Sequence, residues 1–230
     1  CSKGLPDALA AKSGGTYVPI SHAELIDRVE RLALALRARG LQAGDHVAIV
    51  SENRPEWAIL DYACALSGMP SVPIYPTLNG PQTSYVLRNS GARWVFCSTA
   101  EQVQKVIGQK DELPALEGIV MMDDGREPEG SGVLHWSRLL DEGQAMDGRR
   151  SEVRAWAAER RAGDLLTLIY TSGTTGDPKG AMLTHGNVVS NILASVPVLD
   201  IRLGDRSLSF LPLSHIFERM AGHYALLYAG

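Results

Sequence analysis

Cysteine is scarce in this 230-residue sequence, which has only Cys1, Cys64 and Cys97, and no two of them stand in a CxxC spacing. We therefore expect neither a disulfide framework nor a zinc site, and the reducing cytoplasm is the simplest location. Long apolar runs are also missing. The closest approach to the roughly 20 residues that cross a bilayer is 57–66, and Asp61 interrupts it. Residues 1–15 lack the basic and then apolar pattern of a secretion signal.

An excess of charge of one sign is missing as well. The 22 Lys and Arg residues face 26 Asp and Glu residues, which leaves a formal net charge of −4. This balance argues against a nucleic-acid-binding protein and against a polybasic membrane surface. Hydrophobic residues make up 45% of the chain, which supplies a sizeable core and excludes intrinsic disorder. The length fits one large domain or two small ones.

What the sequence does contain is an alternation of extended and helical segments. This pattern predicts an α/β fold in which helices cover a parallel-rich sheet. The expected strands are 46–50, 71–75, 93–97, 118–122, 165–171 and 207–211. The expected helices begin near residues 21, 55, 81, 98, 151 and 187. Segment 165–171 is apolar on both faces and is expected to be buried, whereas three prolines make 71–75 an edge or irregular strand.

Two capping boxes indicate helix starts. Ser21 with Glu24 is expected to open the first helix, and Ser98 with Glu101 the helix after 93–97, because each pair satisfies free backbone donors of the first turn. Residues 123–132 are rich in Gly, Asp and Glu and are expected to form a surface loop.

Several other polar residues have ordinary explanations. The first helix carries charged pairs at i,i+4, which predict a solvated face: Glu24 with Arg28, and Asp27 with Arg31. Cys64 lies in an apolar helical run and is expected in the core, and His185 is expected to make a contact at a helix start. The arginines within 149–161 alternate with acids, which favours local ion pairs over binding to phosphates or a membrane.

The most informative stretch is 170–180, with the sequence YTSGTTGDPKG, directly after the buried strand. Its three glycines let backbone N–H groups approach an anion, its Thr and Ser side chains offer hydroxyl donors, and Lys179 adds a mobile charge. It is not a Walker A loop, because that motif needs a glycine before the lysine and a Ser or Thr after it. The composition predicts a polyphosphate site, and the alternative is a turn without a ligand.

Segment 170–180 resembles the phosphate-binding signature of the adenylate-forming, or AMP-binding, superfamily, which includes acyl-CoA synthetases, luciferases and the adenylation domains of peptide synthetases. The similarity continues through 181–187, and 44–53 and 68–77 fit the N-terminal pattern of the family. Segment 208–219, LSFLPLSHIFER, resembles the next motif in its long-chain fatty acyl-CoA synthetase version. The resemblance covers nearly the whole chain.

This resemblance implies a long-chain fatty acid–CoA ligase of fatty acid metabolism. A fatty-acid carboxylate would attack the α-phosphorus of ATP, release pyrophosphate and leave an acyl adenylate, and the coenzyme A thiolate would then expel AMP. The implied cofactors and co-substrates are ATP, Mg²⁺ and coenzyme A. A lipid-like substrate is compatible with a peripheral position at a membrane, while the oligomeric state stays open.

The resemblance also implies roles for single residues. The ATP phosphates are assigned to Tyr170, Thr171, Ser172, Gly173, Thr174, Thr175, Gly176, Lys179 and Gly180. Lys179 and His215 are implied as catalytic residues, and His215 and Glu218 as contacts of the acyl substrate. For Glu218 and Arg219, a structural ion pair or a charge at a helix start is an almost equally good explanation.

Parts of the family pattern are absent. The later Tyr-Gly-x-Thr-Glu segment, whose glutamate holds Mg²⁺, does not occur, and neither does the small C-terminal domain with its lysine. The later Thr-Gly-Asp of the ribose site is also missing, because residues 175–177 have the same letters but lie inside the phosphate loop. We therefore expect residues 1–230 to be the N-terminal portion of the large AMP-binding domain, without metal ligands and inactive alone. A ligase for an aryl, short-chain or amino acid, or a non-catalytic nucleotide-binding module, remains an alternative.

Overall fold

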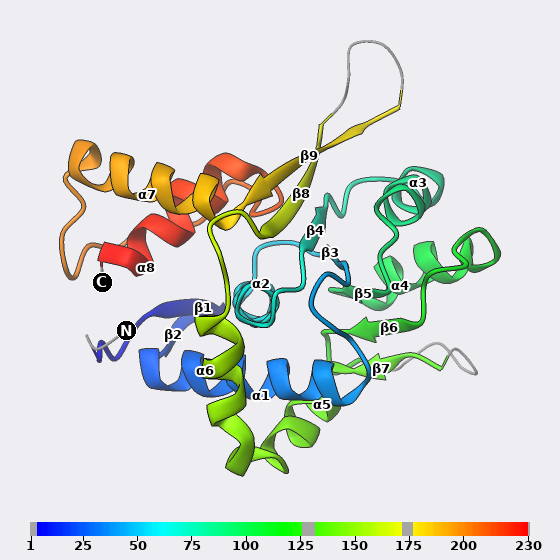
Figure 1. Ribbon diagram of the computed structural model, residues 1–230, viewed down its shortest axis with the longest axis horizontal. Coiled ribbons are helices and arrows are strands. Elements are labelled where there is room, and N and C mark those ends of the chain that lie inside the picture. The colour runs from blue at the N-terminus through cyan, green and yellow to red at the C-terminus, as the bar shows by residue number, and fades with distance from the viewer. Residues whose placement is uncertain (1–3, 126–131, 172–176, 230) are drawn as a thin grey trace.

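The computed structural model describes residues 4–125, 132–171 and 177–229. Within them, seven strands form a central sheet (Figure 1). Their spatial order is β7 (Leu134–His135), β6 (Gly118–Met121), β5 (Trp94–Cys97), β3 (Val47–Val50), β4 (Ser71–Ile74), β8 (Leu165–Thr171) and β9 (Lys179–Thr184). All neighbours from β7 to β8 pair in parallel, and β9 is antiparallel to β8. The predicted parallel-rich α/β fold is confirmed.

Helices cover both faces of this sheet. One face carries α1 (His22–Ala38), α2 (Pro55–Ser67), α5 (Trp136–Gln144) and α6 (Arg150–Ala158), and the other carries α3 (Gly80–Ser90) and α4 (Ala100–Ile107). Strand β3 shows why both faces must be covered: Val47 and Ile49 pack with the α1 and α2 side chains, while Ala48 and Val50 pack with those of α3 and α4. A strand that is apolar on both faces is stable only between two layers.

The remaining elements lie at the two ends of the chain or are short. Strands β1 (Leu9–Ser13) and β2 (Thr16–Ile20) pair antiparallel, separately from the main sheet. Single 3₁₀ turns are η1 (Lys110–Glu112) and η2 (Asp147–Arg149). Helix α7 (His185–Leu199), the π-helix η3 (Glu218–Tyr224) and α8 (Ala225–Ala229) pack on one another beside the base of the β8–β9 hairpin (Figure 1).

The connections create a switch point between β3 and β5. From β3 the chain passes through α2 to β4 on one side, whereas from β5 it passes through α4 to β6 on the other side. Helices α2 and α4 lie on opposite faces of the sheet. In open α/β sheets, ligands bind beyond the carboxyl ends of the strands at such a point.

The predicted helix starts are partly right. Ser21 caps α1, because its Oγ accepts a hydrogen bond from the Glu24 N–H at 3.1 Å, but the Glu24 carboxylate pairs with Arg28 instead of closing the box. The second box is wrong. Helix α4 begins one residue later than expected, with the Thr99 side chain accepting from the Gln102 N–H.

The predicted edge position of segment 71–75 is also wrong, because β4 lies inside the sheet between β3 and β8. Pairing of β4 with β8 is confined to Ser71 opposite Thr167 in the described strands. The rest of β4 therefore makes few hydrogen bonds to β8. Pro73, which has no N–H to donate, is tolerated at this position.

Segment 207–211 is not a strand, contrary to prediction, and its residues are exposed. The side chain of Asn53 takes the place of a neighbouring strand. Its Nδ2 donates to the carbonyl oxygens of Ser209 at 3.3 Å and Leu211 at 2.7 Å. One side chain thus satisfies backbone acceptors that a strand ladder would otherwise have to satisfy.

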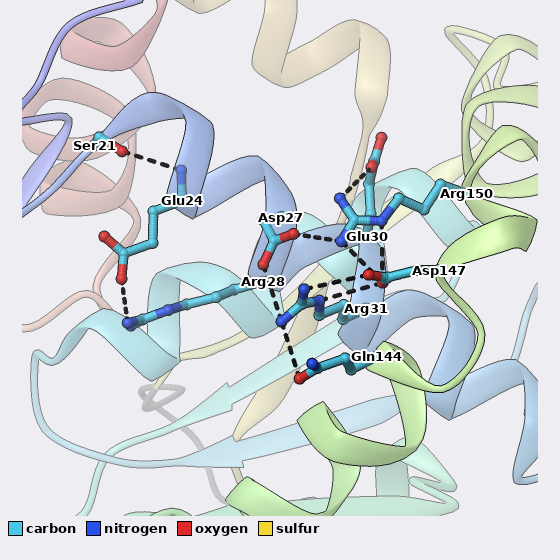
Figure 2. Close-up of polar contacts among 9 residues, drawn as sticks. All are labelled: Ser21, Glu24, Asp27, Arg28, Glu30, Arg31, Gln144, Asp147 and Arg150. Carbon is cyan, nitrogen blue, oxygen red and sulfur yellow. Dashed lines mark hydrogen bonds and ion pairs between the residues drawn. The ribbon is translucent and has the colours of Figure 1, made fainter.

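The charged face of α1 is more than a solvated surface. Both predicted pairs form, Glu24 with Arg28 and Asp27 with Arg31. Figure 2 shows that the Asp27–Arg31 pair extends into a network, in which Arg31 also contacts Asp147 and Arg150 reaches Asp27 and Glu30. The Glu30 side chain is only 5% exposed. The network therefore joins α1 to the α5–α6 region across a half-buried interface.

Candidate functional site

The predicted phosphate-binding motif lies on the β8–β9 hairpin at one edge of the sheet (Figure 1). Tyr170 and Thr171 end β8, and Lys179 and Gly180 begin β9, so the flanks of the predicted loop 170–180 are strands. Thr171 pairs with Lys179, and Tyr170 with Gly180. Five predicted ligands lie outside the described residues: Ser172, Gly173, Thr174, Thr175 and Gly176.

Helix α3 anchors the loop end of this hairpin. The Tyr170 hydroxyl donates to Asn89 Oδ1 at 2.6 Å, and the Tyr85 hydroxyl donates to the Pro178 carbonyl oxygen at 3.1 Å. Burial raises the pKa of the Tyr170 hydroxyl, and the nearby Tyr85 adds to the rise, so Tyr170 remains a donor at neutral pH. Gly180 lies against the same ring: a Cβ there would be 3.1 Å from Tyr170 Cζ. The hairpin is thus fixed at the end where its two strands lead into the loop.

Thr171 and Lys179 are exposed neighbours on the two strands. Side chains of a directly opposed pair have Cβ atoms about 4.5–5.5 Å apart. A hydroxyl donor and an ammonium group therefore stand at the same end of the hairpin, in contact with solvent. Such a pair can bind phosphate oxygens, since both groups donate hydrogen bonds and one carries a positive charge.

The segment before His215 is held at the carboxyl ends of β3 and β4. Asn53, three residues after β3, accepts a hydrogen bond from the Leu213 N–H through Oδ1 at 2.8 Å. Ser214 Oγ donates to the carbonyl oxygen of Ile74, the last residue of β4, at 3.4 Å. Because β4 and β8 run in parallel, this segment and the hairpin leave the sheet at the same edge. The structure brings the Lys179 hairpin and the His215 segment to the same edge of the sheet, beyond the carboxyl ends of β3, β4 and β8.

His215 itself is exposed, and a hydrogen bond from a neighbouring backbone N–H orients its ring. The ring nitrogen Nδ1 accepts a hydrogen bond from the Phe217 N–H at 3.2 Å. In the neutral imidazole, the nitrogen that accepts carries no proton, so Nε2 carries it. His215 can therefore present an N–H donor to a ligand oxygen at this edge of the sheet.

Glu218 and Arg219 are buried, in contrast to His215. Glu218 is 5% exposed, and its Oε1 has no hydrogen-bond partner among the described residues. It packs closely on the next turn, because a Cβ on Gly222 would lie 2.4 Å from that oxygen. Arg219 is fully buried and paired with Asp61. The ion pair expected as an alternative for Arg219 is present.

His185 and Cys64, which were also considered in the sequence, are both held by contacts within the fold. His185 begins α7, where its N–H donates to the Asp164 carbonyl oxygen at 3.0 Å, and burial lowers its pKa. Cys64 is a free cysteine in the core, as expected, and burial raises the pKa of its thiol. A buried thiol with a raised pKa is a poor nucleophile.

The sequence interpretation missed three residues that shape this site, Asn53, Tyr85 and Asn89. Only Asn53 carried a signal, since it follows a predicted strand within a segment that fits the family pattern. In the described part of the chain, no three His, Cys, Asp or Glu side chains are grouped to hold a metal ion.

Comparison with known proteins assigns this arrangement to a family. Residues 2–230 match the family described as "AMP-binding enzyme". The chain is 39% identical over 208 residues to the long-chain-fatty-acid–CoA ligase FadD15 of Mycobacterium bovis, which covers 89% of this chain and 33% of that protein. It is 33% identical over 226 residues to long-chain-fatty-acid–CoA ligase 5 of Rattus norvegicus, which covers 91% of this chain and 32% of that protein.

A solved structure of a long-chain-fatty-acid CoA ligase from Rhodopseudomonas palustris has the same architecture. Its TM-score is 0.74 at 25% sequence identity, over 94% of this chain and 50% of that chain. The present chain spans about a third of the length of the two curated relatives.

Proposed function

The chain belongs to the AMP-binding enzyme family, and on this premise we propose that it is the N-terminal portion of a long-chain fatty acid–CoA ligase. The reaction would join a fatty-acid carboxylate to the AMP part of ATP, release pyrophosphate, and then transfer the acyl group to coenzyme A. The long-chain class is supported by the named relatives and by the sequence of segment 208–219.

One observation carries the proposal: the exposed Lys179–Thr171 pair and the His215 segment leave the sheet at the same carboxyl edge. In the adenylation step, negative charge grows on the departing pyrophosphate. Lys179 and Thr171 would stabilise it through hydrogen bonds from groups that are already in place. The Nε2–H of His215 would donate to an oxygen of the carboxylate or of the α-phosphate.

The proposal includes the location and the partners of the protein. Fatty acid, ATP and coenzyme A are the proposed substrates, with Mg²⁺ held by the ATP phosphates and by residues outside the described ones. None of the helices described for residues 4–125, 132–171 and 177–229 is both long and apolar enough to span a membrane. We propose a cytoplasmic enzyme, since both described cysteines are free and buried.

The proposal is tested by Lys179→Ala in the full-length protein. We expect fatty-acid-dependent exchange between ATP and pyrophosphate to fall about 100-fold, because a lost transition-state donor typically costs that much. The matched control is Lys110→Ala, which removes another exposed lysine, one that lies in η1, away from the hairpin. An unchanged rate in Lys179→Ala would contradict the phosphate role.

The substrate class is tested by running the same exchange across carboxylic acids. A preference for acetate, an aryl acid or an amino acid would contradict the long-chain proposal while keeping the adenylation reaction. Nucleotide binding without exchange for any acid would favour the non-catalytic module.

A further inference from the structure

Arg219 is a fully buried arginine, and its counter-ion Asp61 on α2 is also fully buried. Its Nε donates to Asp61 Oδ2 at 3.0 Å, and its Nη2 donates to Asp61 Oδ1. The Tyr224 hydroxyl accepts from the same Nε at 3.1 Å and donates to Asp61. Burial alone would lower the pKa of Arg219, but the charges and hydrogen bonds of Asp61 and Tyr224 together raise it. Arg219 therefore stays charged inside the protein.

The Arg219 guanidinium also donates hydrogen bonds to two hydroxyls, which lie where β4 pairs with β8. Nη1 donates to Thr167 Oγ1 at 2.8 Å, and Nη2 donates to Ser71 Oγ at 2.8 Å. Ser71 and Thr167 form the register pair through which β4 meets β8. Thr167 Oγ1 also donates to the Ser71 carbonyl oxygen at 2.7 Å. Arg219 thus links β8, the first strand of the hairpin, to β4 in the parallel part of the sheet.

The same arginine belongs to the His215 segment. Arg219 lies four residues after His215, and its backbone N–H donates to the His215 carbonyl oxygen at 3.2 Å. In the other direction, β8 leads from Thr167 to Thr171, which pairs with Lys179. Arg219 is therefore bonded on one side to the segment that carries His215 and on the other to the strand that leads to Lys179.

We propose that Arg219, held by Asp61, is a positioning residue that sets the His215 segment relative to the hairpin that carries Lys179. This inference rests on the function proposed above. Because Arg219 is fully buried, it acts through these two segments and not on a substrate. Only arginine has the planar set of donors that matches one carboxylate and two hydroxyls at once, so lysine would keep the charge and lose the geometry.

The first test is Thr167→Val in the full-length protein, which removes the hydroxyl on β8 and leaves the Asp61–Arg219 pair. The matched control is Thr83→Val, because Thr83 is also buried and its hydroxyl has no hydrogen-bond partner among the described residues. We expect amide hydrogen exchange in 165–171 to become about tenfold faster in Thr167→Val and to stay unchanged in the control. Equal exchange in both variants would overturn the proposal.

The second test measures coupling between Arg219 and His215. We expect Thr167→Val and Arg219→Lys each to lower the turnover number of fatty-acid-dependent pyrophosphate exchange about tenfold, as a small displacement of reacting groups does. In a His215→Ala background, the same substitutions should have little further effect, since the group being positioned is gone.

If instead the effects multiply, Arg219 has a merely structural role and the proposal is overturned. If the wild-type protein shows no exchange with any fatty acid, the proposed function fails. Hydrogen exchange in 165–171, measured also in Arg219→Lys, which keeps the bond from Thr167 to the Ser71 carbonyl oxygen, then still decides whether Arg219 links the hairpin strand to the sheet.

Discussion

At the scale of single residues, His223 is the clearest case of a side chain controlled by its surroundings. It is 5% exposed and contacts aromatic rings, with centroids 5.0 Å from Tyr62 and 5.2 Å from Tyr224. Burial lowers the pKa of His223 to about 4, against the raising effect of Asp61 and with a smaller lowering effect from Arg219. His223 is therefore neutral in the folded protein at pH 7.

This makes stability depend on pH in a defined direction. The unfolded chain binds a proton at His223 near pH 6.5, whereas the folded chain does so only near pH 4. Stability from this residue is present above pH 6.5 and is lost as the pH falls toward 4. Relative to His223→Leu, the wild-type free energy of unfolding should drop by about 2 kcal/mol between pH 7 and 5. Urea denaturation at several pH values measures this, and parallel pH profiles for both proteins would contradict it.

At the scale of elements, the contact between α1 and α5 depends on a glycine. A Cβ built on Gly143 of α5 would lie 2.1 Å from the Arg31 carbonyl oxygen of α1. The two helix backbones therefore touch at this point, and no flexible side chain can move aside. The ion pairs of Arg31 and Arg150 surround the same interface (Figure 2).

Gly143→Ala should push α5 away from α1. We expect a loss of about 2–3 kcal/mol in the free energy of unfolding, as for other overpacked sites. Gly148→Ala is the control, since a Cβ at Gly148 meets nothing within 4 Å, and it should stay within about 0.5 kcal/mol of wild type. Urea denaturation of both variants checks this, and equal stabilities would show that the helices can separate without cost.

At the scale of the whole molecule, most of the large exposed apolar side chains follow β8 in the sequence. They are Met182, Val189, Leu193, Val198, Leu199, Leu203, Leu208, Phe210, Leu211, Phe217 and Tyr228. Val198 and Phe210 are the most exposed of them, at 83% and 76%. The amino-terminal layers of the fold, in contrast, enclose their apolar side chains between helices and sheet.

We expect the 230 residues by themselves to form no acyl-CoA from a fatty acid, ATP and coenzyme A, whereas the full-length protein does. The described residues include the Thr171–Lys179 end of the β8–β9 hairpin and the segment before His215, and among them no three His, Cys, Asp or Glu side chains are grouped as metal ligands. Mass-spectrometric detection of acyl-CoA, with both proteins at equal concentration, tests this. Acyl-CoA formation by the 230-residue chain would refute it.

The sequence by itself determined the features whose signals are local. The apolar runs of β3, β5 and β8, the proline at the start of α2 and the cap at Ser21 all depend on neighbours within a few residues. The family resemblance of 170–180 was likewise contained in one short stretch. Elements with weaker local signals, β7, β9 and α5, were not predicted, because contacts with segments distant in the sequence decide their conformation.

Tertiary structure alone decided how distant residues meet. Asp61 reads in the sequence as an interruption of an apolar helix, yet it is the counter-ion of Arg219, 158 positions away. Segment 71–75 has the sequence of an edge or irregular strand and lies inside the sheet. Segment 207–211 has the sequence of a strand, but the Asn53 side chain donates hydrogen bonds to its carbonyl oxygens instead of a neighbouring strand. The physical reason is the same in each case. The partner of a buried charge, the neighbours of a strand and the donor to a free backbone carbonyl are all groups that lie far away in the sequence. A local sequence pattern therefore cannot identify them.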